Sequence, residues 1–248
     1  MKIVFTPDWF IGKDVLIEAF SFLVLILFCV LAIKYYQMVK DRKFLYLIYG
    51  FGLIAVANLA SIFTKLVLYY DFGLSREIGE ILVSTYAIHS VDIFYYMGFF
   101  VQKLFTLLGL YTIYRLPRES KSRGDYLLIV YFIIISALVS ENFYYIFHIT
   151  ALVLIVMIVE NYYGIYQRNK FKNTFILTAS FTLLGLSQLI FIMSEIGSIF
   201  VLANIVELIS YGFLLGLIIK ILENGKKTKP DGHHLRYVRN NSGKGWKH

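Results

Sequence analysis

The sequence predicts an all-helical integral membrane protein with seven transmembrane helices, its N-terminus outside the cell membrane and its C-terminus in the cytoplasm. Of the 248 residues, 58% are hydrophobic and only 16% are charged, and the mean hydropathy is +0.69. A water-soluble domain of this size cannot bury so much apolar surface in one core. The apolar residues fall into stretches of roughly 20, the length that crosses about 30 Å of hydrocarbon. The lipid bilayer is therefore the expected solvent.

Seven apolar stretches predict the spans, which together make residues 1–224 one membrane domain. The spans are 15–36, 44–69, 91–115, 126–140, 143–166, 174–196 and 198–222. The fourth is the shortest. Pairs of adjacent tyrosines stand near several of the predicted ends, where amphipathic rings prefer the membrane interface. None of the spans contains a proline, so the sequence predicts uninterrupted helices.

The distribution of basic residues predicts the orientation. One set of alternate connections, together with the C-terminal tail, carries Lys34, Lys40, Arg42, Lys43, Arg115, Arg118, Lys121, Arg123, Arg168, Lys170, Lys172, Lys226, Lys227, Lys229, Arg236 and Arg239. The other set carries only Lys2, Lys13 and Arg76. Because cytoplasmic connections are enriched in Lys and Arg, this asymmetry predicts an odd number of spans with the C-terminus inside. The net charge of +8 is thus an orientation signal, and no nucleic-acid partner is predicted.

Two segments lie outside the spans. In residues 71–90, Ile78, Ile81 and Leu82 share one helical face, which predicts an amphipathic helix along the outer surface. Residues 225–248 form a polar, basic tail interrupted by Pro230 and Gly232, and such a composition cannot form a core. Because apolar and basic residues alternate in it, the expected partners of this tail are anionic lipid or a cytoplasmic protein.

Two stretches of the sequence resemble each other and suggest a parallel internal repeat. Tyr35-Tyr36 with Lys43-Phe44 matches Tyr162-Tyr163 with Lys170-Phe171, and FGLIAVANL at 51–59 matches FTLLGLSQL at 181–189. The alternative is chance similarity between apolar sequences. A true repeat predicts two three-helix halves joined by the short fourth span, an architecture that places a binding site between the halves.

Ionisable residues within the spans predict a polar site in the outer half of the membrane. Lys103 lies midway along the third span, preceded by Gln102, and Glu207 on the seventh lies at similar depth. Because a lone charge in hydrocarbon costs several kcal/mol, we expect Lys103 and Glu207 to face each other as an ion pair. The alternative is a pair that only fixes helix packing. Lys65, near the outer end of its span, is expected to snorkel to the interface.

Neutral polar residues at similar depth complete the predicted ligand site. They are Asn58, Gln188 and Asn204, on the second, sixth and seventh spans. The expected ligand is a small molecule or an ion. No nucleophile and base, metal-ligand cluster or cofactor motif is present in the sequence, so no catalytic residue, metal or cofactor is predicted. Gly212 and Gly216 form a small-residue seam suited to packing against a neighbouring helix or a second copy of the protein.

The predicted topology resembles those of rhodopsin-like receptors and of the three-plus-one-plus-three sugar carriers. The resemblance covers no motif: the middle of the seventh span holds Glu207 where a retinal protein has its Schiff-base lysine, and the carriers' Pro-Gln pairs are missing. Two functions therefore stay open. The first is a receptor-like or signalling protein with an outer ligand pocket, and the second is a solute or ion-coupled transporter that uses Lys103 and Glu207.

Overall fold

The computed structural model describes residues 7–40, 42–78, 85–115, 123–140, 143–194 and 197–227. In these ranges the chain is helical apart from short connections, and it contains no strand. A short 3-10 helix at Asp8–Phe10 precedes seven α-helices. They are α1 (Lys13–Val39), α2 (Arg42–Ile78), α3 (Thr85–Arg115), α4 (Arg123–Val139), α5 (Tyr144–Asn169), α6 (Lys172–Ile192) and α7 (Gly197–Lys227).

Six of these helices contain segments long and apolar enough to cross a bilayer. The segments are Lys13–Gln37, Phe44–Val67, Tyr96–Arg115, Tyr144–Asn169, Lys172–Ile192 and Gly197–Ile221. The apolar part of α4 covers only Ile129–Val139. The sequence prediction of an all-helical, multi-pass membrane protein is therefore confirmed, whereas the seventh span and the orientation stay predictions.

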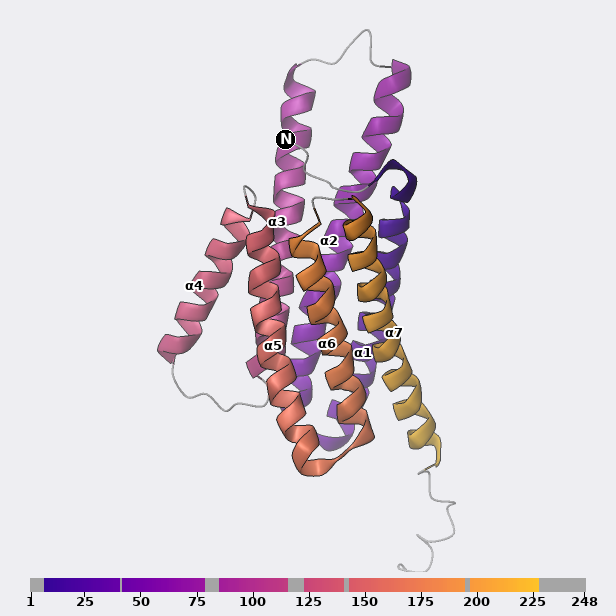
Figure 1. The fold of residues 1–248 in the computed structure, drawn as a ribbon, viewed down its shortest axis with the longest axis vertical. Helices are drawn as coiled ribbons and strands as arrows, with labels where there is room; N and C mark the ends of the chain where they lie inside the picture. Colours follow the sequence, from indigo (N-terminus) through magenta and orange to yellow (C-terminus); the bar gives the residue numbers. More distant parts are fainter. Residues whose placement is uncertain are drawn as a thin grey trace, which may run out of the picture.

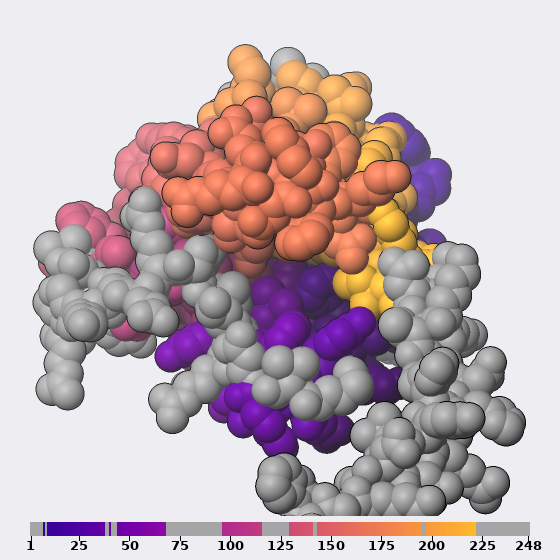
Figure 2. Space-filling view, turned by 90° about the horizontal axis from the view of Figure 1, so that it is seen from below, coloured from indigo at the N-terminus to yellow at the C-terminus, as the bar shows by residue number. Residues whose placement is uncertain are grey.

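The helices form two groups of three consecutive neighbours. In the first group α2 packs against α1 and α3, and in the second α6 packs against α5 and α7. Contacts of α3 with α5 and of α1 with α7 join the groups. Helix α4 packs against α3 and α5 and lies at the side of the bundle (Figure 1). Seen from below, the α5–α6 hairpin lies opposite α2, with α7 beside it (Figure 2).

The α1–α2 and α5–α6 hairpins are built on the same kind of turn. Helix α1 ends at Lys40 and α5 at Lys170, both with a left-handed backbone (φ 58° and 54°). The Lys40 amide donates to the Tyr36 carbonyl at 2.8 Å and the Lys170 amide to the Tyr166 carbonyl at 2.7 Å, which satisfies carbonyls that the helix end leaves unpaired. Each lysine ammonium also lies over the ring of its tyrosine.

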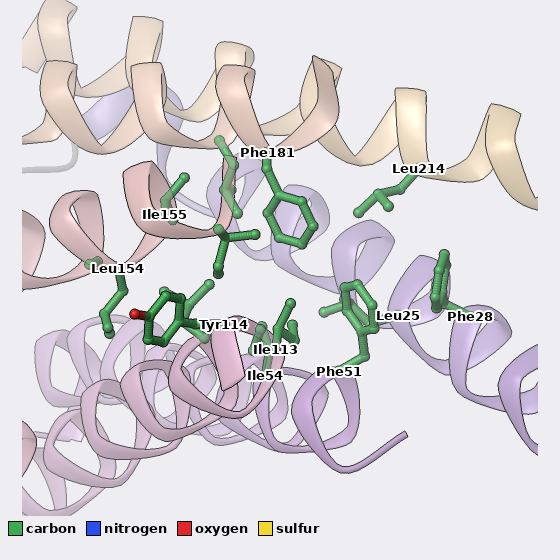
Figure 3. Close-up of a cluster of buried hydrophobic side chains, with 14 of the residues drawn as sticks. Leu25, Phe28, Phe51, Ile54, Ile113, Tyr114, Leu154, Ile155, Phe181 and Leu214 are labelled. Carbon is green, nitrogen blue, oxygen red and sulfur yellow. The ribbon is translucent and has the colours of Figure 1, made fainter. Parts of the chain in front are cut away.

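An apolar core fills the bundle near these turns. Phe51 on α2 contacts Phe28 on α1, with ring centroids 4.4 Å apart, and Phe181 on α6 at 6.3 Å. Ile113 on α3 and Leu214 on α7 belong to the same buried cluster. Figure 3 shows these side chains converging from helices of both groups. Dispersion between closely packed atoms holds such a core together in lipid, where burial from water adds little.

One close contact between α2 and α3 involves glycines that the sequence analysis did not single out. A Cβ atom at Gly109 on α3 would lie 2.7 Å from the Gly50 carbonyl oxygen on α2, so these helices approach each other at backbone distance. At Gly212 and Gly216 a Cβ atom would meet nothing within 4 Å. Among the described residues the predicted seam on α7 therefore packs against no other helix, and its use by a second copy stays a prediction.

The two segments predicted outside the spans are described only in part. Helix α2 continues to Ile78 and α3 begins at Thr85, so most of residues 71–90 continues the two long helices (Figure 1). Residues 79–84 and most of the C-terminal tail, 228–248, lie outside the described ranges. The surface position of the first segment and the partners of the tail stay predictions.

Candidate functional site

A cavity of about 320 Å³ lies between the two helix groups. It occupies the half of the bundle where α1, α3, α5 and α7 begin and α2, α4 and α6 end, which is the half predicted to face outward. All seven helices contribute to its wall. The polar and charged lining residues are Glu18, Asn58, Ser61, Lys65, Tyr96, Gln102, Lys103, Thr106, Ser140, Tyr144, His148, Gln188, Ser194, Asn204, Glu207 and Tyr211.

The structure brings together every residue that the sequence predicted for the ligand site. The six residues Lys103, Glu207, Gln102, Asn58, Gln188 and Asn204 all line this one cavity. They come from α2, α3, α6 and α7 and therefore from both helix groups. Their placement agrees with the rule that polar groups in membrane helices face the interior of the bundle. Their role in binding a ligand stays a prediction.

Lys103 and Glu207 have different surroundings within the cavity. The Lys103 ammonium donates to the Ser140 carbonyl at the end of α4, at 3.0 Å, and its charge also acts on His148 of α5. Glu207 lies close enough to Glu18 and Lys65, on α1 and α2, for their charges to act on it. The structure has no direct ion pair between these two described side chains, which contradicts the predicted pairing, and both line the same cavity.

Lys65 is part of a buried ion cluster, which corrects the prediction that it snorkels. Its ammonium lies 2.9 Å from Asp14 Oδ2 and 2.6 Å from Glu18 Oε1, and its side chain is only 9% exposed. The Ser61 hydroxyl donates to Glu18 Oε1 at 3.0 Å, and the Gly12 amide donates to Asp14 Oδ1 at 3.1 Å. A charge far from water needs such partners. Four-residue spacing of Asp14 and Glu18 on one helical face was the signal that sequence reasoning missed.

A hydrogen-bonded pair of polar side chains occupies the α5–α6 hairpin. His148 Nδ1 on α5 lies 2.8 Å from Gln188 Oε1 on α6, and because an amide oxygen only accepts, Nδ1 is the protonated ring nitrogen. The imidazole stacks on Phe191, with centroids 5.0 Å apart. In the ranges that the structure describes, no three His, Cys, Asp or Glu side chains come together as metal ligands. The site offers charged and hydrogen-bonding groups, with no evident catalytic pair.

Two buried polar atoms in the cavity wall have no hydrogen-bond partner. They are Glu18 Oε2, an acceptor, and Asn58 Nδ2, a donor. Each such atom destabilises the protein by about 1–3 kcal/mol relative to a hydrogen-bonded one. A bound molecule with a donor and an acceptor at suitable positions would satisfy both.

The floor of the cavity is the upper surface of the apolar core. Ile54, Leu110, Ile155, Leu184 and Tyr211 belong both to the cavity wall and to the buried cluster, and Figure 3 shows Ile54 and Ile155 beside the rings that fill the bundle. The polar cavity therefore ends midway through the bundle. No protein-family model, curated protein or solved structure matches the chain.

Proposed function

We propose that this protein is a membrane carrier for a small polar solute, which enters the cavity from the outer side and leaves toward the cytoplasm. The observation that carries the proposal is the position of the cavity: it lies between two three-helix groups, has charged walls and ends on a closed apolar core. A site between two halves that is closed at one end is the arrangement that alternating access requires.

The contacts between the helix groups support a relative movement of the two halves. Each group is held by extensive packing between consecutive helices, whereas the groups meet through α3 with α5 and α1 with α7. Rocking at these two contacts would separate the Phe51 and Phe181 rings, which lie 6.3 Å apart across the closed core. Such a movement would open the inner end without breaking either group.

The repeat suggested by the sequence supports the same proposal. The equivalent turns relate Lys40 to Lys170, and the same sequence offset relates Phe51 to Phe181 and Asn58 to Gln188. The match of Lys43 with Lys170 does not share this offset and is out of register with the turns. With seven spans and a basic cytoplasmic side, α4 would be the linker that gives both halves the same orientation in the cell membrane.

Uptake into proteoliposomes tests the proposal. The purified full-length chain would be reconstituted and supplied with labelled amino acids, sugars, carboxylates, amines and inorganic ions. We expect uptake of one solute class that Lys103→Met or Glu207→Gln abolishes. The matched controls are Lys34→Met and Glu160→Gln, whose native side chains are exposed outside the cavity. An absence of flux for every class, in vesicles where the protein is folded, would refute the carrier proposal.

A receptor-like signalling protein is the second candidate, favoured by one observation. The described segments of the helices that line the cavity run without a proline or a break, whereas carriers often use interrupted helices at the site. A receptor would bind its ligand without flux and pass a helix movement to the cytoplasmic side. Recovery of a cytoplasmic partner that is lost when residues 225–248 are deleted would support this alternative.

A further inference from the structure

We infer that the cavity binds its solute through a hydroxyl group held between Glu18 Oε2 on α1 and Asn58 Nδ2 on α2. The solute is accordingly a small, uncharged molecule with several hydroxyl groups. This inference rests on the proposed function and names the chemistry that the cavity recognises. It is carried by the two unpartnered atoms, by their positions on one hairpin and by the corresponding pair of residues in the other helix group.

The two unpartnered atoms belong to neighbouring turns of the α1–α2 hairpin. The Ser61 hydroxyl donates to Glu18 Oε1 at 3.0 Å, which holds the carboxylate over α2. Asn58 is one turn before Ser61, about 4.5 Å away along the helix axis. Both Glu18 and Asn58 line the cavity, and the terminal torsions of such side chains are soft. Glu18 Oε2 and Asn58 Nδ2 can therefore turn toward one ligand group between them.

The other helix group has a direct hydrogen bond at the corresponding positions. The sequence offset between the two hairpin turns relates Glu18 to His148. The same offset relates Asn58 to Gln188. His148 Nδ1 and Gln188 Oε1 are bonded at 2.8 Å, whereas in the first group the carboxylate is engaged one turn further along α2. The first group therefore keeps an acceptor and a donor where the second has already joined its pair.

A hydroxyl group satisfies both atoms at once. An ionised carboxylate oxygen only accepts and an amide nitrogen only donates. An ammonium group on the solute would leave Asn58 Nδ2 unpaired, and a carboxylate would leave Glu18 Oε2 unpaired. A hydroxyl oxygen both donates and accepts, and two hydrogen bonds of about 2.8 Å at a tetrahedral angle span about 4.6 Å. A primary amide uses separate atoms for the two bonds and needs a wider gap.

The rest of the cavity suits further hydroxyl groups and no charge. Gln102, Thr106 and Asn204 line it as neutral hydrogen-bonding residues. The two lysines of the wall, Lys65 and Lys103, both have partners, so an anionic group on the solute would find no unpaired lysine there. The volume of about 320 Å³ lies at the small end of the range for ligand sites. A small polyol or sugar meets these conditions.

The test measures binding of labelled erythritol, xylitol, mannitol and glucose to the full-length protein in nanodiscs. Leucine, acetate and choline serve as comparison probes with charged groups. We expect the tightest binder to be one of the hydroxylated probes. One of its monodeoxy analogues, which lacks the bridging hydroxyl, should bind about tenfold or more weakly, because both protein atoms are left unpaired again.

Two leucine substitutions assign the site. Asn58→Leu removes the donor and should weaken binding of the tightest probe about tenfold, while the weak monodeoxy analogue should bind this variant and the native protein alike. Asn161→Leu is the matched control, because Asn161 Nδ2 is also buried without a partner but lies outside the cavity lining. Each substitution replaces an unpaired buried donor by an apolar group of similar size, so both variants should fold. Thermal unfolding in nanodiscs checks this.

The outcomes separate this inference from the proposed function. Tightest binding of a charged probe, no binding of any hydroxylated probe by the folded protein, or equal binding by Asn58→Leu would overturn the inference. Uptake of a charged solute alone would overturn it as well, while the carrier proposal would stand. Binding of a hydroxylated probe with the expected dependence on Asn58, but without flux in vesicles, would support the inference and refute the carrier.

Discussion

The half of the bundle predicted to face outward and the half predicted to face the cytoplasm, here called the outer and inner halves, use the same helices in opposite ways. In the outer half, Lys65 joins Asp14 and Glu18 beside a cavity that has charged groups in its wall. In the inner half, Phe51 and Phe181 meet in a core without a charged side chain among its buried members. Charges in a membrane require compensation, whereas apolar groups require only close packing. The outer half therefore presents charged and polar groups to the cavity, and the inner half is filled by tightly packed apolar side chains.

The largest effect on stability is expected from a substitution at Lys65. In Lys65→Met, Asp14 and Glu18 lose their shared cation while still buried, so the unfolding free energy should fall by about 3–5 kcal/mol. The measurement is thermal or denaturant unfolding in nanodiscs. Lys34→Met, with an exposed native side chain, should change little. Equal stability of the two variants would show that the ion cluster is solvated by water.

The second-largest effect on stability is expected from substitutions in the apolar core of the inner half. Phe51 is 1% exposed and Phe63 on the same helix is 56% exposed. Substitutions at these two positions therefore distinguish the loss of core packing from the loss of lipid contact. Phe51→Ala leaves a void between Phe28 and Phe181 and should lower stability by about 2–4 kcal/mol. Phe63→Ala should change it by much less, because lipid tails refill the space. A core that tolerates both substitutions equally would contradict a tightly packed inner closure.

A smaller effect is expected where α2 and α3 touch. In Gly109→Ala the new Cβ meets the Gly50 carbonyl oxygen, and since backbone cannot move aside cheaply, we expect a loss of about 1–3 kcal/mol. The control is Gly216→Ala, where the added methyl meets nothing within 4 Å. If Gly216→Ala were the more damaging change, α7 would pack against another copy of the protein.

The smallest predicted effect concerns hydrogen bonds between α6 and α7. The Ser180 and Ser210 hydroxyls each donate to the other's carbonyl, at 2.9 and 2.8 Å. Ser180→Ala removes one of these bonds and should destabilise the protein by about 0.6–1.7 kcal/mol. Ser187 is equally buried on α6 but donates within its own helix, so Ser187→Ala is the matched control. Equal melting temperatures of the two variants would show that the interhelical hydrogen bonds do not stabilise the protein.

The sequence predicts much of this division between the halves, for a physical reason. A polar residue midway along an apolar helix has no water to reach, so Lys103, Glu207 and Asn58 can be assigned to the bundle interior from their depth alone. Their presence around one cavity follows from that constraint. Helix positions follow in the same way from the length and hydropathy of each apolar stretch.

The depth of a residue in the membrane does not predict which other residue it contacts. Lys103 bonds the carbonyl of Ser140, a backbone atom whose position depends on how α4 packs. Lys65 meets Asp14 and Glu18 because α1 and α2 form a hairpin that brings their outer ends together. The Gly50–Gly109 contact depends on the rotation of two helices about their axes. These details arise from tertiary packing, which a single sequence does not encode in its local pattern.

Cysteine accessibility can show directly whether the cavity opens outward above a closed core. In a Cys29→Ala background, Thr106→Cys places a thiol in the cavity wall and Ser180→Cys places one in the buried interior. A membrane-impermeant methanethiosulfonate reagent would be applied to sealed vesicles of each orientation. We expect labelling of Thr106→Cys from the outer face alone, with Ser180→Cys protected from both faces. Labelling of Thr106→Cys from the cytoplasmic face, with protection from the outer face, would contradict it.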